Sequence, residues 1–296
     1  MMVEASGKPS YPTRSGWARA WVSIRRDRAA VIGLGLVLLV LLLATVGPFL
    51  APYDVTKQDL LHRRMPPTPQ HLLGLDEFGR DILSRMLVGA RYTLGVSLLA
   101  VVIGLLLGVS LGLVAGFYGG WWDIVIMRFV DTLLAFPYLL LAIVIVGALG
   151  PGLNNAILAV GIAALPTYAR VTRGVVLSLK ENEYVLAARA MGSTARWIVM
   201  SHILPNALAP VIVVATVGMA QATLSAAALS FLGLGAQPPT PEWGAMLSGG
   251  RSFLFDAPHI ATFPGLAIVL AMLGFNLLGD GLRDALDPRL RNVARQ

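Results

Sequence analysis

The sequence predicts an all-α membrane protein with about six transmembrane helices and both termini in the cytoplasm. Hydrophobic residues make up 56% of the 296 residues and charged residues only 13%, whereas soluble domains contain about 45–50% apolar and about 25% charged residues. The apolar residues form continuous runs, long enough to cross about 30 Å of hydrocarbon as helices. Most Lys and Arg residues fall on one side of the membrane when the runs are taken as spans, which indicates that this side is the cytoplasm.

The apolar runs divide the chain into spans and connecting segments. The predicted spans are 29–50, 92–118, 124–149, 153–178, 206–228 and 259–280. The predicted segments are a cytoplasmic N-terminal part (1–28), extracytoplasmic loops (51–91 and 229–258), a core domain (92–280) with a cytoplasmic loop (179–205), and a cytoplasmic tail (281–296). The fourth span is the least apolar, because it contains Pro166 and ends through Arg170 and Arg173.

The distribution of basic residues sets the orientation. With the N-terminus inside, 16 of the 23 Lys and Arg residues lie on the cytoplasmic side and 7 lie outside. The 16 include Arg128, Arg170 and Arg173, which lie within predicted spans. Cytoplasmic loops of membrane proteins carry this excess, so the net charge of +7 indicates membrane orientation rather than nucleic-acid binding.

The first apolar run is expected to be a retained span. It begins near residue 29, is too long for a secretory signal and lacks a small-residue cleavage site. Trp17 and Trp21 precede it, four residues apart and next to several arginines, which predicts an interfacial helix on the cytoplasmic surface. The alternative is a disordered basic tail.

The second span carries a ladder of small residues. Ala100, Gly104, Gly108, Gly112 and Gly116 follow one another at four-residue spacing, so they share one helix face. Such faces let transmembrane helices approach closely. We therefore expect this span to be buried among other helices; the alternative is a direct role toward substrate.

The third span contains two charges near its cytoplasmic end. Arg128 and Asp131 lie three residues apart and Pro137 follows six residues later, so the two charges share a helix face. We expect a structural ion pair whose ends reach toward the interface. Because charges inside a membrane are usually functional, a proton or substrate site is the alternative.

The loop at 179–205 combines helix-forming and helix-ending residues. Ala187 and Ala188 favour a short helix, Gly192 can end or bend it, and Pro205 is expected to restart the chain at the fifth span. The charge distribution places this loop in the cytoplasm.

This loop resembles the coupling loop of ABC-importer permeases, whose pattern is Glu-Ala-Ala, three residues, Gly, nine residues, Ile, one residue, Leu-Pro. Aligned on Gly192, the chain supplies Ala187, Ala188, Leu204 and Pro205. In that family the short helix docks in a cleft of the ATPase subunit and transmits its closure.

The chain departs from the pattern at two positions. Leu186 stands where the pattern has Glu, and His202 where it has Ile. Glu183, one turn earlier, is expected to supply the acidic contact instead. The resemblance thus implies that the residues coupling this chain to the ATPase are Glu183, Ala187, Ala188, Gly192, Leu204 and Pro205.

Three further stretches, 71–92, 229–247 and 279–289, resemble the dipeptide, oligopeptide and nickel permease family. The extra first span and the Asp-Pro-Arg ending resemble its C-type subunit. The resemblance implies a type I importer of the bacterial inner membrane. Its expected partners are a second permease, two ATP-binding subunits that hold ATP and Mg²⁺, an extracytoplasmic binding protein and a short-peptide substrate.

The outer loops are expected to meet the binding protein. Pro238, Pro239 and Pro241 interrupt the chain, which predicts that the following stretch, 242–255, re-enters the interface and helps form an outer gate. The predicted contacts are charged residues: Asp76, Glu77, Arg80, Asp81 and Glu242. The alternative is an ordinary solvated loop.

The translocation path is expected to run between this subunit and its partner, lined by the third to fifth spans, without a tight substrate site. Few polar side chains lie in these spans. The candidates are Asn154, Asn155, Thr216, Gln221 and Ser225, with Thr223 beside them.

Other functions find less support. The chain has no cysteine and its four histidines are scattered, so no metal site is expected. It has no Gly-x4-Gly-Lys-Ser/Thr loop for ATP and no recognisable Ser-His-Asp set, so no catalytic role and no cofactor of its own are expected. A secondary transporter is the poorer alternative, because neither an inverted repeat nor a chain of intramembrane acids is found. Dipeptides, oligopeptides, glutathione-like peptides and nickel complexes all stay open as cargo.

Overall fold

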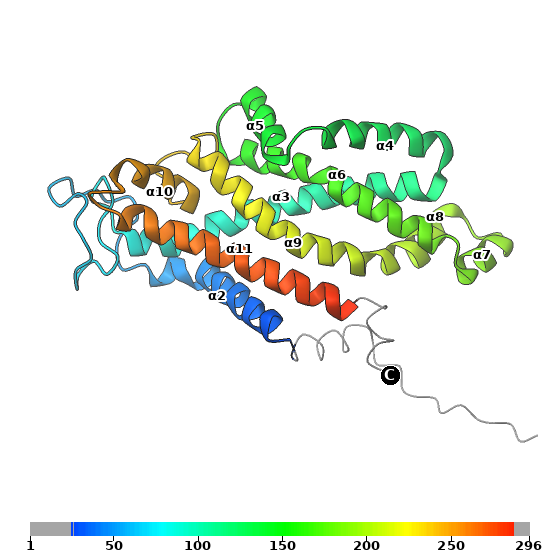
Figure 1. Ribbon diagram of the computed structural model, residues 1–296, viewed down its shortest axis with the longest axis horizontal. Coiled ribbons are helices and arrows are strands. Elements are labelled where there is room, and N and C mark those ends of the chain that lie inside the picture. Colours follow the sequence, from blue (N-terminus) through cyan, green and yellow to red (C-terminus); the bar gives the residue numbers. More distant parts are fainter. Residues whose placement is uncertain (1–24, 26, 287–296) are drawn as a thin grey trace, which may run out of the picture.

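The structure is a computed structural model that describes Arg25 and residues 27–286. The predicted interfacial helix at Trp17 and Trp21 and the tail beyond residue 286 lie outside the described residues. Every regular element within the described range is a helix, which confirms the all-α prediction (Figure 1). The elements are α2 (Arg28–Leu50), α3 (Ile82–Tyr118), α4 (Gly120–Leu134), α5 (Tyr138–Leu149), α6 (Leu153–Leu179), α7 (Glu183–Ala190), α8 (Ala195–Ile198), η1 (Val199–Ile203), α9 (Leu204–Phe231), α10 (Trp243–Gly250), η2 (Arg251–Phe253) and α11 (His259–Leu286).

Within residues 27–286, four helices are long and apolar enough to cross a bilayer: α2, α3, α11 and the continuous helix that joins α8, η1 and α9. A fifth candidate is broken. α4 and α5 are apolar enough together, but they meet at 93°, so the third predicted span, 124–149, is sharply bent near its middle. Pro137 stands at the break, where it lacks an N–H and disfavours helical backbone in the residue before it.

The predicted fourth span corresponds to α6, which has 27 residues. It falls outside the set of apolar candidates because Asn154, Asn155, Arg170 and Arg173 lie within it. The other helices compensate for this polarity, since α6 packs against α3, α5 and α9 and buries much of its length. Helices shielded by protein need fewer apolar residues than helices that face lipid.

The contact between α3 and α6 depends on the glycine ladder. A Cβ atom added at Gly108 would lie 2.6 Å from the carbonyl oxygen of Leu165, and one at Gly112 would lie 2.5 Å from that of Ala169. Gly104 and Gly116 show the same close approach to α6. The bare helix face therefore serves helix packing, as small residues commonly do in membranes.

The fifth span begins earlier than predicted. The helix runs without interruption from Ala195 to Phe231, so the expectation that Pro205 restarts the chain is wrong. Val199–Ile203 form a π-helical segment, and Pro205 follows in the first turn of α9. The π-helical segment interrupts the regular α-helical hydrogen bonds just before Pro205, whose backbone has no N–H to donate. π-Helical segments often occur at functional sites.

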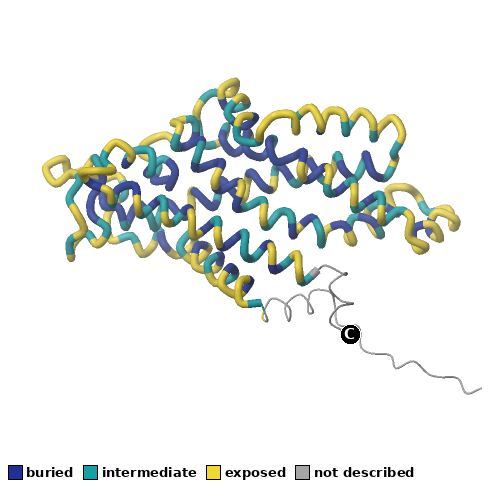
Figure 2. Tube along the Cα trace, viewed as in Figure 1, coloured by how far each residue is buried: buried dark blue, intermediate teal, exposed yellow. Residues whose placement is uncertain are grey.

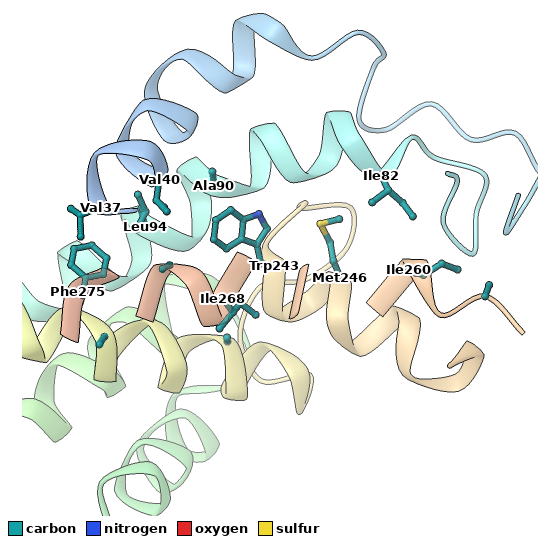
Figure 3. Close-up of a cluster of buried hydrophobic side chains, with 14 residues drawn as sticks. Val37, Val40, Ile82, Ala90, Leu94, Trp243, Met246, Ile260, Ile268 and Phe275 are labelled. Carbon is teal, nitrogen blue, oxygen red and sulfur yellow. The ribbon is translucent and has the colours of Figure 1, made fainter. Parts of the chain in front are cut away.

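α10 returns into the bundle after the proline-rich loop. Trp243, at its first position, is 1% exposed and lies among Ala90, Met246 and Ile268 (Figure 3). Its ring Nε1 donates to the Met86 carbonyl oxygen at 3.0 Å. The cluster holds α3, α10 and α11 together at one end of the molecule.

The molecule has two distinct ends (Figure 1). α7 and α8 lie at one end, and α10 lies at the other with the loop between α2 and α3. The orientation from the charge distribution makes the first end cytoplasmic. Figure 2 shows that buried residues follow the inner faces of the bundle, whereas α2 and α4 are largely exposed. Exposed apolar side chains on these two helices include Leu38, Leu42 and Phe129, as expected of surfaces that meet lipid or another subunit.

Candidate functional site

Gly192 closes α7 as the sequence predicted. Its φ of +81° is left-handed, and its N–H donates to the Arg189 carbonyl oxygen at 2.9 Å while the Ser193 N–H donates to that of Ala188 at 3.0 Å. This pair of hydrogen bonds is a Schellman motif, which glycine forms at the lowest cost because it has no Cβ. α7 is therefore a short, sharply ended helix.

One face of α7 anchors it to the bundle. Val185 and Ala188 are 0% and 2% exposed and pack with Val176, Ile198 and Ile203. These partners belong to α6, α8 and η1, so movement of α7 would be transmitted to the helices on both sides of the loop. Ala188 thus seats the helix and is not available to a partner.

The opposite face of α7 is open and largely apolar. Leu186 is 46% exposed and Met191 is 78% exposed, and Glu183 and Ala187 are exposed beside them. Exposed apolar side chains grouped at a charged end are typical of a protein contact surface. The departure of Leu186 from the family pattern adds an apolar group to this surface.

His202, the second departure, joins α7 to the π-helical segment. Its ring lies 4.6 Å from that of Trp197 and 5.8 Å from that of Tyr184, both edge-on. Edge-to-face aromatic contacts of this kind stabilise their partners modestly. Of the other predicted coupling residues, Leu204 is half-buried and Pro205 is exposed.

At the extracytoplasmic end, Asp76 organises the loop before α3. Its Oδ1 accepts the N–H groups of Phe78 and Arg80, each at 2.9 Å, and its Oδ2 accepts Arg80 Nε at 2.6 Å. Arg85 Nε lies 3.4 Å from the same Oδ2, without hydrogen-bond geometry. Asp76 and Arg80 are 3% and 6% exposed.

Two further acids of this end begin helices. Asp81 caps α3, because its Oδ2 accepts the N–H and hydroxyl of Ser84, each at 2.7 Å. Glu242 caps α10 by accepting the Ala245 N–H at 2.9 Å, and it also accepts the Thr93 hydroxyl of α3 at 3.2 Å. Both carboxylates are buried.

The prediction that these charges contact a binding protein is therefore wrong for Asp76, Arg80, Asp81 and Glu242. A side chain that is buried and saturated with internal partners has no surface to offer, and the solvated-loop alternative is equally wrong. Asp81 and Glu242 stand just before helix starts, where acids are recruited as caps, whereas Asp76 and Arg80 pair with each other inside the folded loop. Glu77 is partly exposed, at 17%, and its contact stays a prediction.

A cavity of about 360 Å³ lies beside this network. Glu77, Arg80 and Arg85 line one side, and the proline-rich loop and α10 line the other. The predicted re-entry of the chain after the prolines thus coincides with an opening at the extracytoplasmic end. No group of three or more metal-binding side chains occurs among the described residues.

Glu77 should make stability depend on pH. Burial raises the pKa of its carboxyl above the ordinary 4.5, and the neighbouring Asp76 carboxylate raises it further. The folded protein then holds a proton over a pH window where the unfolded chain has lost it, so stability falls as pH rises from about 4.5 through that window. Glu77→Gln keeps an acceptor for Arg80 but removes this penalty.

We expect the Gln variant to melt higher than wild type at pH 7, with the difference shrinking toward pH 4.5, in thermal scans of the purified protein. Asp54→Asn is the control of opposite sign, because hydrogen bonds from Thr56 lower the pKa of that exposed carboxyl. A pH-independent difference for Glu77→Gln would contradict the account.

Two ion pairs join α4 to α6 in the cytoplasmic half of the bundle. Arg173 Nη2 donates to Asp123 Oδ2 at 2.6 Å, and Arg170 Nη2 donates to Asp131 Oδ1 at 2.7 Å. The predicted pair of Asp131 with Arg128 is thus wrong in its partner, because the two antiparallel helices bring an arginine of α6 closer than the residue one turn away.

The predicted path residues fall into two groups. Ser225 and Thr223 are 2% and 0% exposed, so the prediction that Ser225 lines a path is wrong; it accepts Gln221 Nε2 at 3.3 Å. Gln221 and Asn154 are exposed and Thr216 is half-buried, and their role stays a prediction. Asn155 has a structural use, because its Nδ2 donates to the Leu149 and Gly150 carbonyl oxygens at 3.0 Å, at the end of α5.

Three residues of these networks were not predicted from the sequence: Arg85, Thr93 and Asp123. Arg85 and Asp123 resemble ordinary interface charges, and nothing in the local sequence reveals their partners 9 and 50 residues away. Thr93, an early polar residue of the second span, was the one available signal: a buried hydroxyl in a membrane helix needs a partner.

Comparison with known families agrees with this architecture. Residues 108–292 match the family described as binding-protein-dependent transport system inner membrane component. Residues 15–67 match the N-terminal TM domain of oligopeptide transport permease C.

Individual relatives cover nearly the whole chain. The dipeptide transport system permease protein of Alkalihalophilus pseudofirmus is 46% identical over 282 residues, which are 95% of this chain and 93% of that protein. The glutathione transport system permease protein of Pectobacterium atrosepticum is 46% identical over 280 residues, covering 94% of this chain and 93% of its own length.

Among solved structures, a chain of the MetNI methionine ABC transporter, in an inward-facing conformation, is similar in fold. It has a TM-score of 0.56 and 20% identity, and the match covers 68% of this chain and 96% of that one. At this identity the likeness concerns the fold alone.

Proposed function

The chain belongs to the family of binding-protein-dependent transport system inner membrane components, and we propose that it is the C-type permease subunit of an ATP-driven importer of short peptides. It pairs with a second permease, two ATP-binding subunits and an extracytoplasmic binding protein. ATP and Mg²⁺ are held by the ATP-binding subunits, and this chain converts their closure into movement of its helices.

The observation that carries the proposal is the construction of α7. Its inward residues Val185 and Ala188 are locked to α6, α8 and η1, while Leu186 and Met191 stand exposed at the cytoplasmic end. A partner subunit can bind the exposed face of α7, and the buried face can then transmit the movement of α7 to the bundle. The π-helical segment that leads into α9 supplies a place where that motion can be absorbed.

Short peptides are the cargo that the relatives favour. Those compared are a dipeptide permease and glutathione permeases, and glutathione is itself a tripeptide. In this proposal the binding protein selects the cargo. The path between the two permeases binds the peptide only weakly, because tight binding midway would trap it. The outer cavity beside Glu77 faces the side from which the peptide arrives.

Reconstitution tests the proposal. Proteoliposomes containing both permeases and both ATPases should take up a labelled dipeptide or glutathione only when ATP and the loaded binding protein are present. Micromolar binding of the peptide to the permease pair alone, without the binding protein, would contradict the conduit. Uptake driven by an ion gradient in the absence of ATP would favour a secondary transporter instead.

Leu186→Asp should uncouple the importer. The change places a charge on the apolar outer face of α7 without disturbing the buried face, so the complex should lose an interface anchor. We expect peptide uptake and stimulated ATPase activity to fall at least about tenfold, as for loss of an anchoring contact. Leu186→Met, which keeps an apolar group of similar volume, should retain wild-type rates. Wild-type activity in Leu186→Asp would remove α7 from the coupling path.

A further inference from the structure

The cytoplasmic boundary of the membrane can be placed on the helices themselves. Tyr118, Trp121 and Trp122 are 59%, 74% and 58% exposed where α3 turns into α4, and exposed aromatic residues gather at membrane interfaces. Lys180, just after α6, donates to the Gly116 carbonyl oxygen at 3.3 Å at the same level. These residues define the inner edge of the hydrocarbon.

The ion pair of Asp131 with Arg170 lies well inside this edge. Asp131 is nine residues beyond Trp122 along α4, and Arg170 is ten residues before Lys180 along α6. At 1.5 Å per residue both lie about 14–15 Å along their helices from the boundary. That depth is about half of the roughly 30 Å hydrocarbon core.

This deep pair is exposed. The side chains of Asp131 and Arg170 are 58% and 60% exposed, whereas those of the pair nearer the boundary, Asp123 and Arg173, are 22% and 32% exposed. Charges inside a membrane face a water-filled cavity or protein, because contact with lipid is costly. The face of α4 and α6 that carries Asp131 and Arg170 is therefore not a lipid face.

The neighbouring surface of α6 supports this conclusion. Thr167, Arg170, Gly174 and Ser178 are exposed and recur at three- or four-residue spacing, so they form one polar stripe along the helix. A Cβ atom at Gly174 would meet nothing within 4 Å. A lipid-facing helix such as α2 instead exposes large apolar residues, for example Leu38 and Leu42.

We propose that the Asp131–Arg170 pair lines the aqueous path and acts as a charge-exchange site for the carboxylate and ammonium ends of a zwitterionic peptide. The proposal rests on the proposed importer function. It assigns to Arg170 a transient contact with the peptide carboxylate, and to Asp131 a transient contact with the peptide ammonium group.

The energetics of an exposed ion pair suit such an exchange. A solvated ion pair contributes little to stability, so a peptide end can replace one partner at little cost. The same exposure keeps the peptide from being held tightly, in agreement with a low-affinity conduit. A buried pair would release neither partner, because breaking it leaves an uncompensated charge.

The chain has no cysteine of its own, so a single introduced cysteine can be labelled specifically. Labelling with charged thiol reagents tests the proposal without any peptide. Thr167→Cys lies on the polar stripe one turn from Arg170. In the assembled importer in nanodiscs it should react with two water-soluble methanethiosulfonates, one carrying a sulfonate and one a trimethylammonium group. Leu42→Cys, on the apolar face of α2, should react with neither.

The charges should bias the two reagents in opposite directions. Arg170→Gln should lower the ratio of sulfonate to trimethylammonium reaction rates about tenfold, and Asp131→Asn should raise it about tenfold, the lower end of the effect of local charge on ion concentration. Arg173→Gln, which removes the other pair between the same helices, should change the ratio less than about twofold. A mere clamp between α4 and α6 would leave the ratio unchanged.

Two results would overturn the proposal. One is no reaction at Thr167→Cys in the assembled complex, which would mean that another chain covers the stripe; the other is a ratio of reaction rates that Arg170→Gln does not change.

Peptide uptake distinguishes failure of the exchange site from failure of the proposed importer function. If the wild-type importer takes up no peptide, the importer assignment is wrong. If it takes up peptide but Arg170→Gln leaves the ratio of the two reaction rates unchanged, only the exchange site is wrong. Arg170→Gln should also slow uptake severalfold while the binding protein keeps its affinity for peptide.

Discussion

Gly108→Val should prevent the bundle from assembling. The valine Cβ would stand 2.6 Å from the Leu165 carbonyl oxygen and 2.7 Å from Tyr168 Cβ, and both are held by the rigid helix α6. Because backbone cannot yield as a flexible side chain can, we expect destabilisation of about 3 kcal/mol or more, the upper range for overpacking. Thermal unfolding in detergent and the yield of monodisperse protein would measure it.

Gly95→Val is the matched control, because Gly95 lies on the same helix and a Cβ there would meet nothing within 4 Å. It should fold with nearly wild-type stability. Equal stability of the two variants would show that α3 and α6 do not meet along the glycine face.

Asp76→Ala is expected to have the second-largest effect. Its carboxylate holds the backbone of Phe78 and Arg80 and is the nearest acid to the guanidinium groups of Arg80 and Arg85. Removing it leaves buried positive charge without its main partner, which typically costs about 3–5 kcal/mol. The unfolding temperature and the protease resistance of the loop before α3 should both fall.

Two variants bracket this result. Asp76→Asn keeps acceptors for the backbone N–H groups but loses the charge, so it should be intermediate. Asp54→Ala removes an exposed acid of the same loop whose carboxylate is hydrogen-bonded locally, to Thr56, so it should lower the unfolding temperature much less than Asp76→Ala. A wild-type unfolding temperature for Asp76→Ala would contradict the assigned network.

The sequence was sufficient to predict features that depend on neighbouring residues. Continuous apolar runs predicted helices, the four-residue spacing of the glycines predicted a close helix contact, and Gly192 predicted the end of α7. Each of these is local: it follows from helix periodicity or from the conformational freedom of one residue.

Features that depend on tertiary partners were not predictable in the same way. Asp131 was assigned to Arg128 because they share a helix face, but Arg170 of α6 takes its place in three dimensions. Asp76 and Arg80 were predicted to contact a binding protein, because only the folded loop shows that their side chains are buried. The apolar run at 124–149 predicted one span, but it could not show that α4 and α5 meet at 93° beside Pro137.

The measurement that tests the central claim most directly is cross-linking from α7. Met191→Cys, in a chain without other cysteines, places one thiol at the exposed cytoplasmic end of the loop, where the side chain is 78% exposed. In vesicles that contain the complete importer, a bifunctional thiol reagent should join this cysteine to an ATPase subunit carrying a cysteine in its docking cleft. A membrane-impermeant reagent added from the extracytoplasmic side should leave it untouched. Labelling from that outer side, or cross-links to the binding protein instead of the ATPase, would contradict both the orientation and the coupling role of α7.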